Sequence, residues 1–345
     1  MDESVRKLID KTEKLDVNPE IPRYSTNWCD IPVEMQFECI KWMDFKTRTR
    51  LGATSHTEKS LVEAKKYKYD WIRLQYCNCS YLHGVLTIDA VRNTPPDNVR
   101  LQTIHNHEKM RHFVVQLLKN CGINTFQFLE MDKPSKLQDF WPEIEKCAPF
   151  RFKTFKSDGY ASKGALFFLT NCKGVENILL DNDYINGNYK FSDFTNLPAV
   201  INAKFVQFKH LHKSDRGFYQ LVQKWIDNQS EIGKTLQVVT YFHELVDLFA
   251  SEFEDRVIYK KDDDEVRIRT NEESKHILLR CDRQIRSKSY FSCTIIPSNL
   301  LESEYEKDNQ WVKLTIVEEV FFHDYYHYRT VRRYDDYEND LPPNP

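Results

Sequence analysis

The middle of the chain alternates between strand-like and helix-like segments, and this alternation limits the possible folds more than any other feature. Strand-like runs cover 71–76 and 85–88 and then begin near residues 125, 150, 175, 204 and 236. Helical patterns lie at 107–120, 137–146, 162–171 and 214–228. The alternation predicts parallel strands in chain order, each joined to the next by a right-handed crossover that carries a helix.

The repeat has a regular length. From residue 125 onward the strands start at intervals of about 25 to 32 residues, and three helix–strand pairs, at 113–128, 166–180 and 221–238, look alike. This period, with one strand and one helix in each unit, predicts an irregular leucine-rich-repeat-like α/β domain. The Leu/Asn consensus of that repeat is missing, so a plain α/β layered domain remains an alternative.

Alternation along each strand separates the core side chains from those on the opposite face of the sheet. The core face is expected to hold Phe126, Phe128, Phe152, Ile178, Leu180, Val206, Phe208, Leu236 and Val238. The opposite face is expected to present Gln127, Leu129, Lys153, Phe155, Asn177, Leu179, Asp181, Gln207, Lys209, Val239 and Tyr241. Such a mixture of aromatic, aliphatic and polar groups is typical of a protein-binding patch. The alternative is that Leu129, Phe155 and Leu179 pack under a neighbouring element and bind nothing.

Residues 26–70 read as helices. Pro32 suits the first turn of a helix, and Asp30 and Glu34 place negative charge near its positive end. The apolar residues Met35, Cys39, Ile40, Trp42 and Met43 recur at helical spacing, and further helices are expected at 46–55 and 58–66. A polar arm at 1–25 precedes this region.

The last third of the chain is rich in strands. Strand-like runs lie at 257–260, 266–270, 277–281, 290–296 and 311–317, with a hairpin turn at 262–264. They predict an antiparallel end to the domain that spans 71–330. Residues 331–345 form an acidic tail.

Composition excludes several classes of protein. A chain of 345 residues is long enough for two or three structural units, and its net charge of −3 gives no support for nucleic-acid binding. The sequence has no stretch of 18 apolar residues, so no membrane span is expected. Nine scattered cysteines favour free thiols, which predicts a cytoplasmic or nuclear protein.

No pattern indicates catalysis, a metal or a cofactor. The histidines His105, His107 and His112 lack further ligands at fixed spacing, as do Cys77 and Cys79. His323 and His327 lack the Glu of a zinc-binding helix, and neither a phosphate-binding loop nor a nucleophile elbow occurs. The basic and aromatic run at 329–334 is interpreted as the solvated end of a strand. An enzyme whose site leaves no motif remains an alternative.

The segment from Trp28 to Val62 resembles the F-box. Ile31 and Pro32 stand at that motif's Leu-Pro position, and Met35, Ile40 and Met43 stand at the apolar positions of its helix. The opening Trp28-Cys29-Asp30-Ile31-Pro32 and the run Thr57-Glu58-Lys59-Ser60-Leu61-Val62 are similar to the expanded nematode F-box families. An ordinary helical start to a globular domain is the alternative.

The resemblance implies a partner. F-box modules dock on a Skp-type adaptor, which links them to a cullin and a RING subunit. The residues expected to bind the adaptor are Ile31, Pro32, Met35, Ile40, Met43 and Leu51. Arg48 and Thr49 replace the apolar pair that the family usually has in its second helix, and the sequence leaves open whether they weaken the expected contact.

Residues 194–239 resemble part of the nematode-type F-box-associated (FBA/FTH-like) domain, which implies substrate recognition. The expected function is therefore that of a non-catalytic substrate-recognition subunit of an SCF-type cullin-RING ubiquitin ligase. A protein-interaction module acting outside ubiquitination is the alternative. The residues expected to bind a protein substrate are Lys153, Phe155, Leu179, Asp181, Gln207, Lys209 and Tyr241.

Overall fold

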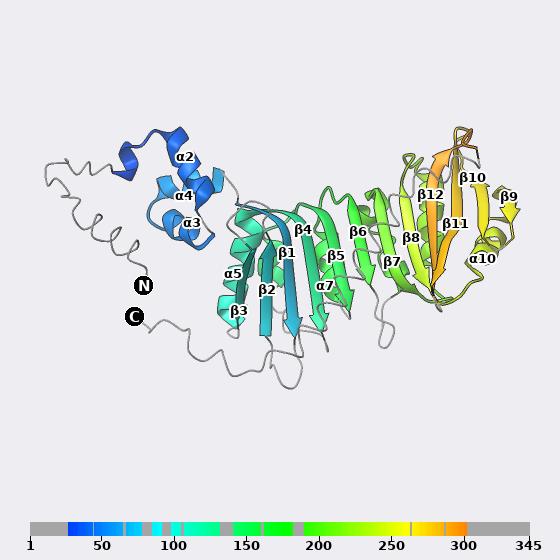
Figure 1. Cartoon of the computed structure of the whole chain (residues 1–345), viewed down its shortest axis with the longest axis horizontal. Coiled ribbons are helices and arrows are strands. Elements are labelled where there is room, and N and C mark those ends of the chain that lie inside the picture. Colours follow the sequence, from blue (N-terminus) through cyan, green and yellow to red (C-terminus); the bar gives the residue numbers. More distant parts are fainter. Residues whose placement is uncertain are drawn as a thin grey trace, which may run out of the picture.

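The chain divides into a small helical module, residues 27–64, and a long sheet domain, residues 67–301 (Figure 1). The computed structural model describes residues 27–43, 45–64, 67–77, 85–91, 98–104, 107–131, 141–159, 162–181, 190–262, 264–285 and 288–301. The polar arm expected at 1–25, the strand expected at 311–317 and the acidic tail expected at 331–345 lie outside these residues.

The helical module consists of short helices. Its elements are η1 (Trp28–Asp30), α2 (Val33–Trp42), α3 (Phe45–Gly52) and α4 (His56–Ala64). Pro32 directly precedes α2 and Glu34 lies in its first turn, as the sequence predicts. The boundary expected at residue 70 falls inside the first strand, whose side chains Tyr67 and Tyr69 are buried in the core of the sheet domain.

The described strands form one twelve-stranded sheet in the order β3-β2-β1-β4-β5-β6-β7-β8-β12-β11-β10-β9. Their bounds are β1 (Tyr67–Cys77), β2 (Val85–Val91), β3 (Asn98–Ile104), β4 (Cys121–Met131), β5 (Phe152–Gly159), β6 (Asn177–Asp181), β7 (Phe205–Leu211), β8 (Thr235–Thr240), β9 (Val257–Lys261), β10 (Glu265–Arg269), β11 (Lys275–Ile285) and β12 (Lys288–Pro297).

The centre of the sheet is parallel. Strand β1 pairs with β4, and β4 to β8 then pair in succession, all in the parallel sense. The prediction of parallel strands in chain order across 120–240 is therefore confirmed. Antiparallel pairs extend both ends, through β2 and β3 on one side and through β12 to β9 on the other. The chain thus has a mixed α/β fold with the expected antiparallel end.

Helices fill the connections between the parallel strands. The described helices of the sheet domain are α5 (His107–Asn120), α6 (Trp141–Glu145), α7 (Ser162–Thr170), η3 (Phe191–Asp193), α8 (Pro198–Asn202), α9 (Gly217–Asp227), α10 (Leu245–Glu252) and η4 (Glu254–Arg256). Figure 1 draws α5 and α7 behind the strands, so the strand face toward the viewer is the opposite one. Among the helices that the structure describes, none is long and apolar enough to cross a membrane.

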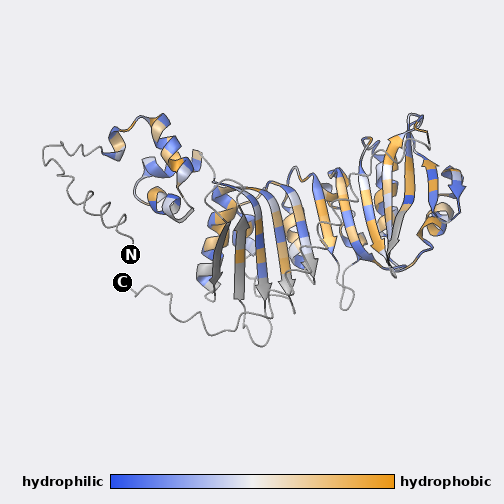
Figure 2. Cartoon of the chain, in the orientation of Figure 1, coloured by the Kyte–Doolittle hydropathy of each residue, from blue (hydrophilic) through white to orange (hydrophobic). Residues whose placement is uncertain are grey.

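Aromatic rings build the core between the sheet and these helices. Phe126 of β4 stacks on Phe152 of β5 at 4.5 Å between ring centroids, and Phe168 of α7 lies 4.8 Å from Phe126. All nine side chains expected on the core face are buried in one cluster, which confirms that prediction. Strands β7 and β8 are buried along most of their length, and Figure 2 shows apolar residues in both, as expected for strands of a buried parallel sheet.

A buried carboxylate joins η3 to the start of α9. The Oδ1 atom of Asp215 accepts hydrogen bonds from the backbone N–H of Gly217 at 2.8 Å and of Ser192 at 3.2 Å, while Oδ2 accepts one from Phe191. The two backbones approach so closely that a Cβ on Gly217 would lie 2.3 Å from the nitrogen of Ser192. Only glycine fits at this position.

The substitution Gly217→Ala should therefore lower the free energy of unfolding by about 2 kcal/mol or more, because the clash involves backbone that cannot move aside. The matched control is Gly122→Ala in β4, where a Cβ would meet its nearest neighbour, Lys68, at 3.7 Å. We expect the control to change stability by less than ~1 kcal/mol. Urea unfolding of both variants measures the difference, and equal midpoints would contradict the close approach.

Candidate protein-interaction sites

Helix α2 presents an apolar stripe to solvent. Met35, Cys39 and Trp42 are spaced four and three residues apart, so they lie on one side of the helix. Met35 is 60% exposed and Trp42 is 72% exposed, and Cys39 is exposed as well. Large apolar side chains this open, aligned on one helix face, are typical of a surface that binds a partner. We call these three residues the α2 stripe.

The opposite side of α2 holds the helix to its module. Ile40 is fully buried and Gln36 is buried beside it. The amide of Gln36 donates a hydrogen bond to the carbonyl oxygen of Trp28 at 2.8 Å, which ties α2 to η1. Because these inward contacts fix the rotation of the helix, the α2 stripe has no freedom to turn inward.

The six residues expected to bind an adaptor do not share one environment. Met35 and Pro32 are exposed, whereas Ile31, Met43 and Leu51 are half-buried. Ile40 was expected in the set that faces the adaptor or anchors the helix, and its side chain, completely enclosed by the module, anchors the helix. Trp42 was not among the residues expected to bind, although it is exposed and continues the helical spacing from Met35 and Cys39.

Arg48 faces the interior rather than the partner side. It is only 4% exposed, and its Nε donates a hydrogen bond to the carbonyl oxygen of Met43 at 3.2 Å. Its guanidinium lies 4.6 Å from the ring centroid of Tyr67, the first residue of β1. This cation–π contact joins α3 to the sheet domain. The side chain of Thr49 lies outside the described residues.

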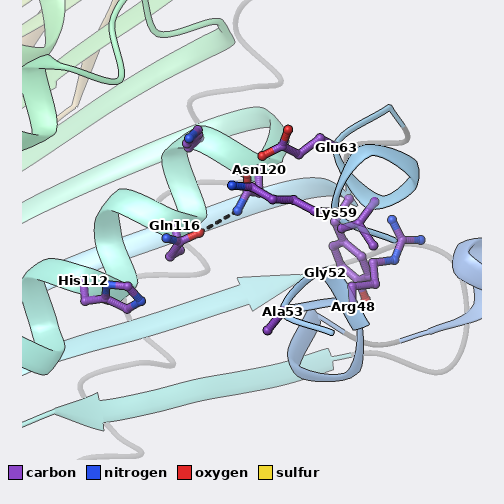
Figure 3. A pocket seen from close by; sticks show the side chains of 11 residues that line it. Arg48, Gly52, Ala53, Lys59, Glu63, His112, Gln116 and Asn120 are labelled. Atoms are coloured by element: carbon purple, nitrogen blue, oxygen red, sulfur yellow. Dashed lines mark hydrogen bonds between the residues drawn. The ribbon is translucent and has the colours of Figure 1, made fainter. Parts of the chain in front are cut away.

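A pocket of about 290 Å³ lies at this junction (Figure 3). Residues of α3 and α4, including Arg48 and Lys59, form one side, and α5 forms the other with His112, Gln116 and Asn120. Within the pocket wall, the amide of Asn120 donates a hydrogen bond to Gln116 Oε1 at 2.7 Å. We call this cavity the junction pocket.

The sheet face opposite the helices carries a row of side chains, called the polar row, that are polar except for Leu179. Strand register aligns Arg73, Gln127, Lys156, Leu179, Gln207 and Gln237 across β1 and β4 to β8. Two pairs of neighbours in this row are joined by hydrogen bonds. Arg73 Nε donates to Gln127 Oε1 at 3.2 Å, and Gln207 Nε2 donates to Gln237 Oε1 at 2.5 Å. Because Gln127, Gln207 and Gln237 are buried, the more exposed groups around the row are the candidates for contact with a partner.

Such groups gather where β6, β7 and β8 end. Lys209 Nζ lies 3.3 Å from Asp181 Oδ2, and His210 Nε2 lies 3.6 Å from Asp181 Oδ1. The His210 ring stacks on Tyr241 at 5.5 Å, and Tyr241 is 39% exposed. The carboxyl ends of parallel strands are a frequent location of binding sites. We call Asp181, Lys209, His210 and Tyr241 the carboxyl-end cluster.

A backbone irregularity aims His210 into this cluster. The register between β7 and β8 shifts between Lys209 and Leu211, and His210 has a φ of 61°. A non-glycine residue in the left-handed region costs energy, and such strain is concentrated at binding sites. The bulge redirects the His210 side chain toward Asp181 and Tyr241.

The residues expected to bind a substrate are only partly brought together. Asp181, Lys209 and Tyr241 meet in the carboxyl-end cluster, whereas Lys153 lies near the start of β5, with its ammonium 3.9 Å from Glu176. Leu179 and Gln207 belong to the polar row, Leu179 half-buried and Gln207 buried.

The placement of Phe155 on this face is wrong. Its side chain is fully buried and packs against Phe168 of α7, on the helix-covered side. Phe155 pairs with Phe126, a core residue of β4, and therefore shares the core face. The prediction assigned the two faces of β5 by alternation from Phe152, the first residue of the strand, and this count placed Phe155 on the opposite face.

The buried thiols of Cys172 and Cys293 and the metal-ligating groups offer no competing site within the described residues. Burial raises the pKa of Cys172 to about 12, and it also raises the pKa of Cys293, so neither thiol forms a reactive thiolate. Among the residues that the structure describes, no three His, Cys, Asp or Glu side chains gather to hold a metal ion. His105, Cys79, His323 and His327 lie outside those residues.

Comparison of the chain with known family models, curated proteins and solved structures found no match.

The two aromatic residues expected on the open face should behave oppositely when truncated. Phe155→Ala should lower the free energy of unfolding by ~3–5 kcal/mol, because it leaves a cavity in the core. Tyr241→Ala should lower it by less than ~1 kcal/mol, because its ring is partly in water. Thermal and urea unfolding of both variants measure the contrast. An unchanged unfolding midpoint for Phe155→Ala would place that ring on the surface after all.

Proposed function

We propose that this chain is a substrate-recognition subunit of an SCF-type cullin-RING ubiquitin ligase. In this proposal the helical module docks on a Skp-type adaptor, and the sheet domain holds a protein substrate. The chain performs no chemistry itself, since ubiquitin transfer takes place on other subunits. It acts in the cytoplasm or nucleus, where that machinery is found.

The α2 stripe is the observation that carries the proposal. It lies in the segment that resembles the F-box, and it offers Met35, Cys39 and Trp42 to a partner while Ile40 and Gln36 hold the helix in place. A helix that lays an apolar face into a hydrophobic groove is a common mode of recognition. Trp is also the residue type that most often contributes a large share of binding energy.

Arg48 supports the proposal by its position. The sequence raised the concern that this charge weakens the adaptor contact. The guanidinium points instead toward Tyr67, so the charge faces the junction pocket rather than the side of α2 that is offered to a partner. Leu51 lies on the same short helix, α3, and its side chain is half-buried.

The sheet domain supplies a plausible surface for a substrate. Its parallel strands in chain order fit a leucine-rich-repeat-like arrangement, in which the strand face is available to partners. The carboxyl-end cluster adds an acid, a base, an imidazole and an exposed aromatic ring at one place. A partly exposed Tyr beside charged groups is suited to protein recognition.

Charge introduced into the α2 stripe should abolish docking. In the double variant Met35→Glu, Trp42→Glu, we expect adaptor binding to weaken by ~100-fold or more, because two apolar contacts are replaced by charges that must be desolvated. Both side chains are exposed, so the melting temperature should not change. Calorimetric titration with a purified nematode Skp-type adaptor measures the affinity.

The control places the same charges on exposed apolar residues elsewhere. Ile232 is 50% exposed and Ile258 is 42% exposed, both in the sheet domain. The variant Ile232→Glu, Ile258→Glu should bind the adaptor as the unmodified chain does. If the α2 variant binds the adaptor with the same affinity as this control variant, docking through α2 is refuted. Recovery of the adaptor without cullin from cells would favour an interaction module outside ubiquitination.

Substitution in the carboxyl-end cluster should impair substrate binding without affecting adaptor binding. We expect the full chain with Lys209→Gln and Tyr241→Ser to retain the adaptor and to lose one or more substrate proteins, as read by affinity purification and mass spectrometry. Lys153→Gln, at the other end of the strands, is the control. If the recovered proteins are identical for all three chains, substrate recognition lies outside this cluster.

A further inference from the structure

The junction pocket lies apart from both candidate protein-interaction surfaces. Its volume of about 290 Å³ is close to the lower limit of pockets that hold small molecules. Two structural units contribute to it, because α3 and α4 of the helical module face α5 and the first residue of β1 across the cavity. A ligand in this position contacts both units at once.

Positive charge dominates the pocket wall. Arg48, Lys59 and Lys119 line it, against the single carboxylate of Glu63. The chain as a whole has a net charge of −3, so this local excess is opposite to the overall balance. A cleft lined mainly by one sign of charge concentrates ions of the other sign.

The two lysines have unused charge. Among the residues that the structure describes, no carboxylate lies within ion-pair distance of the ammonium group of Lys59 or of Lys119. Arg48 is held in place by the carbonyl of Met43 and the ring of Tyr67, so its guanidinium is a fixed part of the wall. A rigid cation with two flexible cations beside it is well suited to a compact anion.

The rest of the wall is apolar or carries amides. Val62 and the Tyr67 ring offer apolar contact, while Gln116 and Asn120 offer hydrogen-bonding groups on α5. A simple inorganic ion would leave the apolar part of the cavity unused. The lining therefore suits a molecule that has an anionic group at one end and an apolar body at the other.

We propose that the junction pocket binds a small organic phosphate monoester. The phosphate group contacts Lys59, Lys119 and the Arg48 side of the cavity, and the organic body packs on Val62 and Tyr67. Phosphate is favoured over carboxylate because its charge of about −1.5 to −2 and its three acceptor oxygens match several cationic donors. By contacting both units, the ligand stabilises their relative orientation.

The test uses phenyl phosphate as the probe and the full chain without any adaptor, so the result does not depend on the proposed function. Calorimetric titration should give a dissociation constant of ~1 mM or tighter. In the variant Lys59→Gln, Lys119→Gln the affinity should fall by ~10-fold or more, because two charge-assisted contacts are lost. Hydrogen exchange should slow in α3, α4 and the end of α5 when the probe is present.

The matched control removes two exposed lysines of the sheet domain, in the variant Lys173→Gln, Lys204→Gln, and should bind phenyl phosphate unchanged. Equal weakening in both variants would overturn the proposal, since it would reflect net charge alone. Equal affinity for benzoate would overturn the choice of phosphate. A phosphoserine peptide that binds far more tightly than phenyl phosphate would show that the pocket reads a modified protein, which also contradicts a small-molecule site.

Discussion

Parallel pairing of successive strands is the constraint on which the rest of the structure depends. Two parallel strands cannot be joined by a tight turn. Each connection between successive strands from β4 to β8 must therefore be long enough to carry the chain back to the end of the sheet where the strands begin. The helices in these connections carry the aromatic residues, such as Phe168 of α7, that bury one face of the sheet. The same geometry brings all the carboxyl ends of these strands to one edge. The carboxyl-end cluster exists because Asp181 ends β6, Lys209 lies near the end of β7 and Tyr241 directly follows β8.

The two surfaces proposed to bind proteins are positioned by different means. The α2 stripe is set by the inward contacts of Gln36 and Ile40 within a small module, whereas the carboxyl-end cluster is set by strand register and by the bulge at His210. Arg48 connects the two parts, because it is anchored within the module by Met43 and contacts Tyr67 at the start of the sheet. A subunit that holds an adaptor and a substrate at once needs such a connection, since the distance between the two partners decides whether ubiquitin can reach its target.

Periodic features could be predicted from the sequence, and features that depend on tertiary contacts could not. The apolar repeats of α5 and the alternation of Phe126 and Phe128 follow from local spacing, and both were predicted correctly. The face of Phe155 was not, because it depends on which residue of β4 lies beside it. The inward turn of Arg48 needs the ring of Tyr67, which a sequence pattern does not place. The bulge at His210 leaves no mark in the sequence, since no glycine signals its positive φ.

Docking through α2 is the central claim, and hydrogen exchange tests it most directly. Exchange would be followed by mass spectrometry for the full chain, alone and with a saturating nematode Skp-type adaptor. The account predicts slower exchange in peptides that cover α2 and η1, with no change in peptides from β6 to β8. Protection of the strand peptides with none in α2, or no protection anywhere under conditions where a known F-box protein binds the same adaptor, would contradict it.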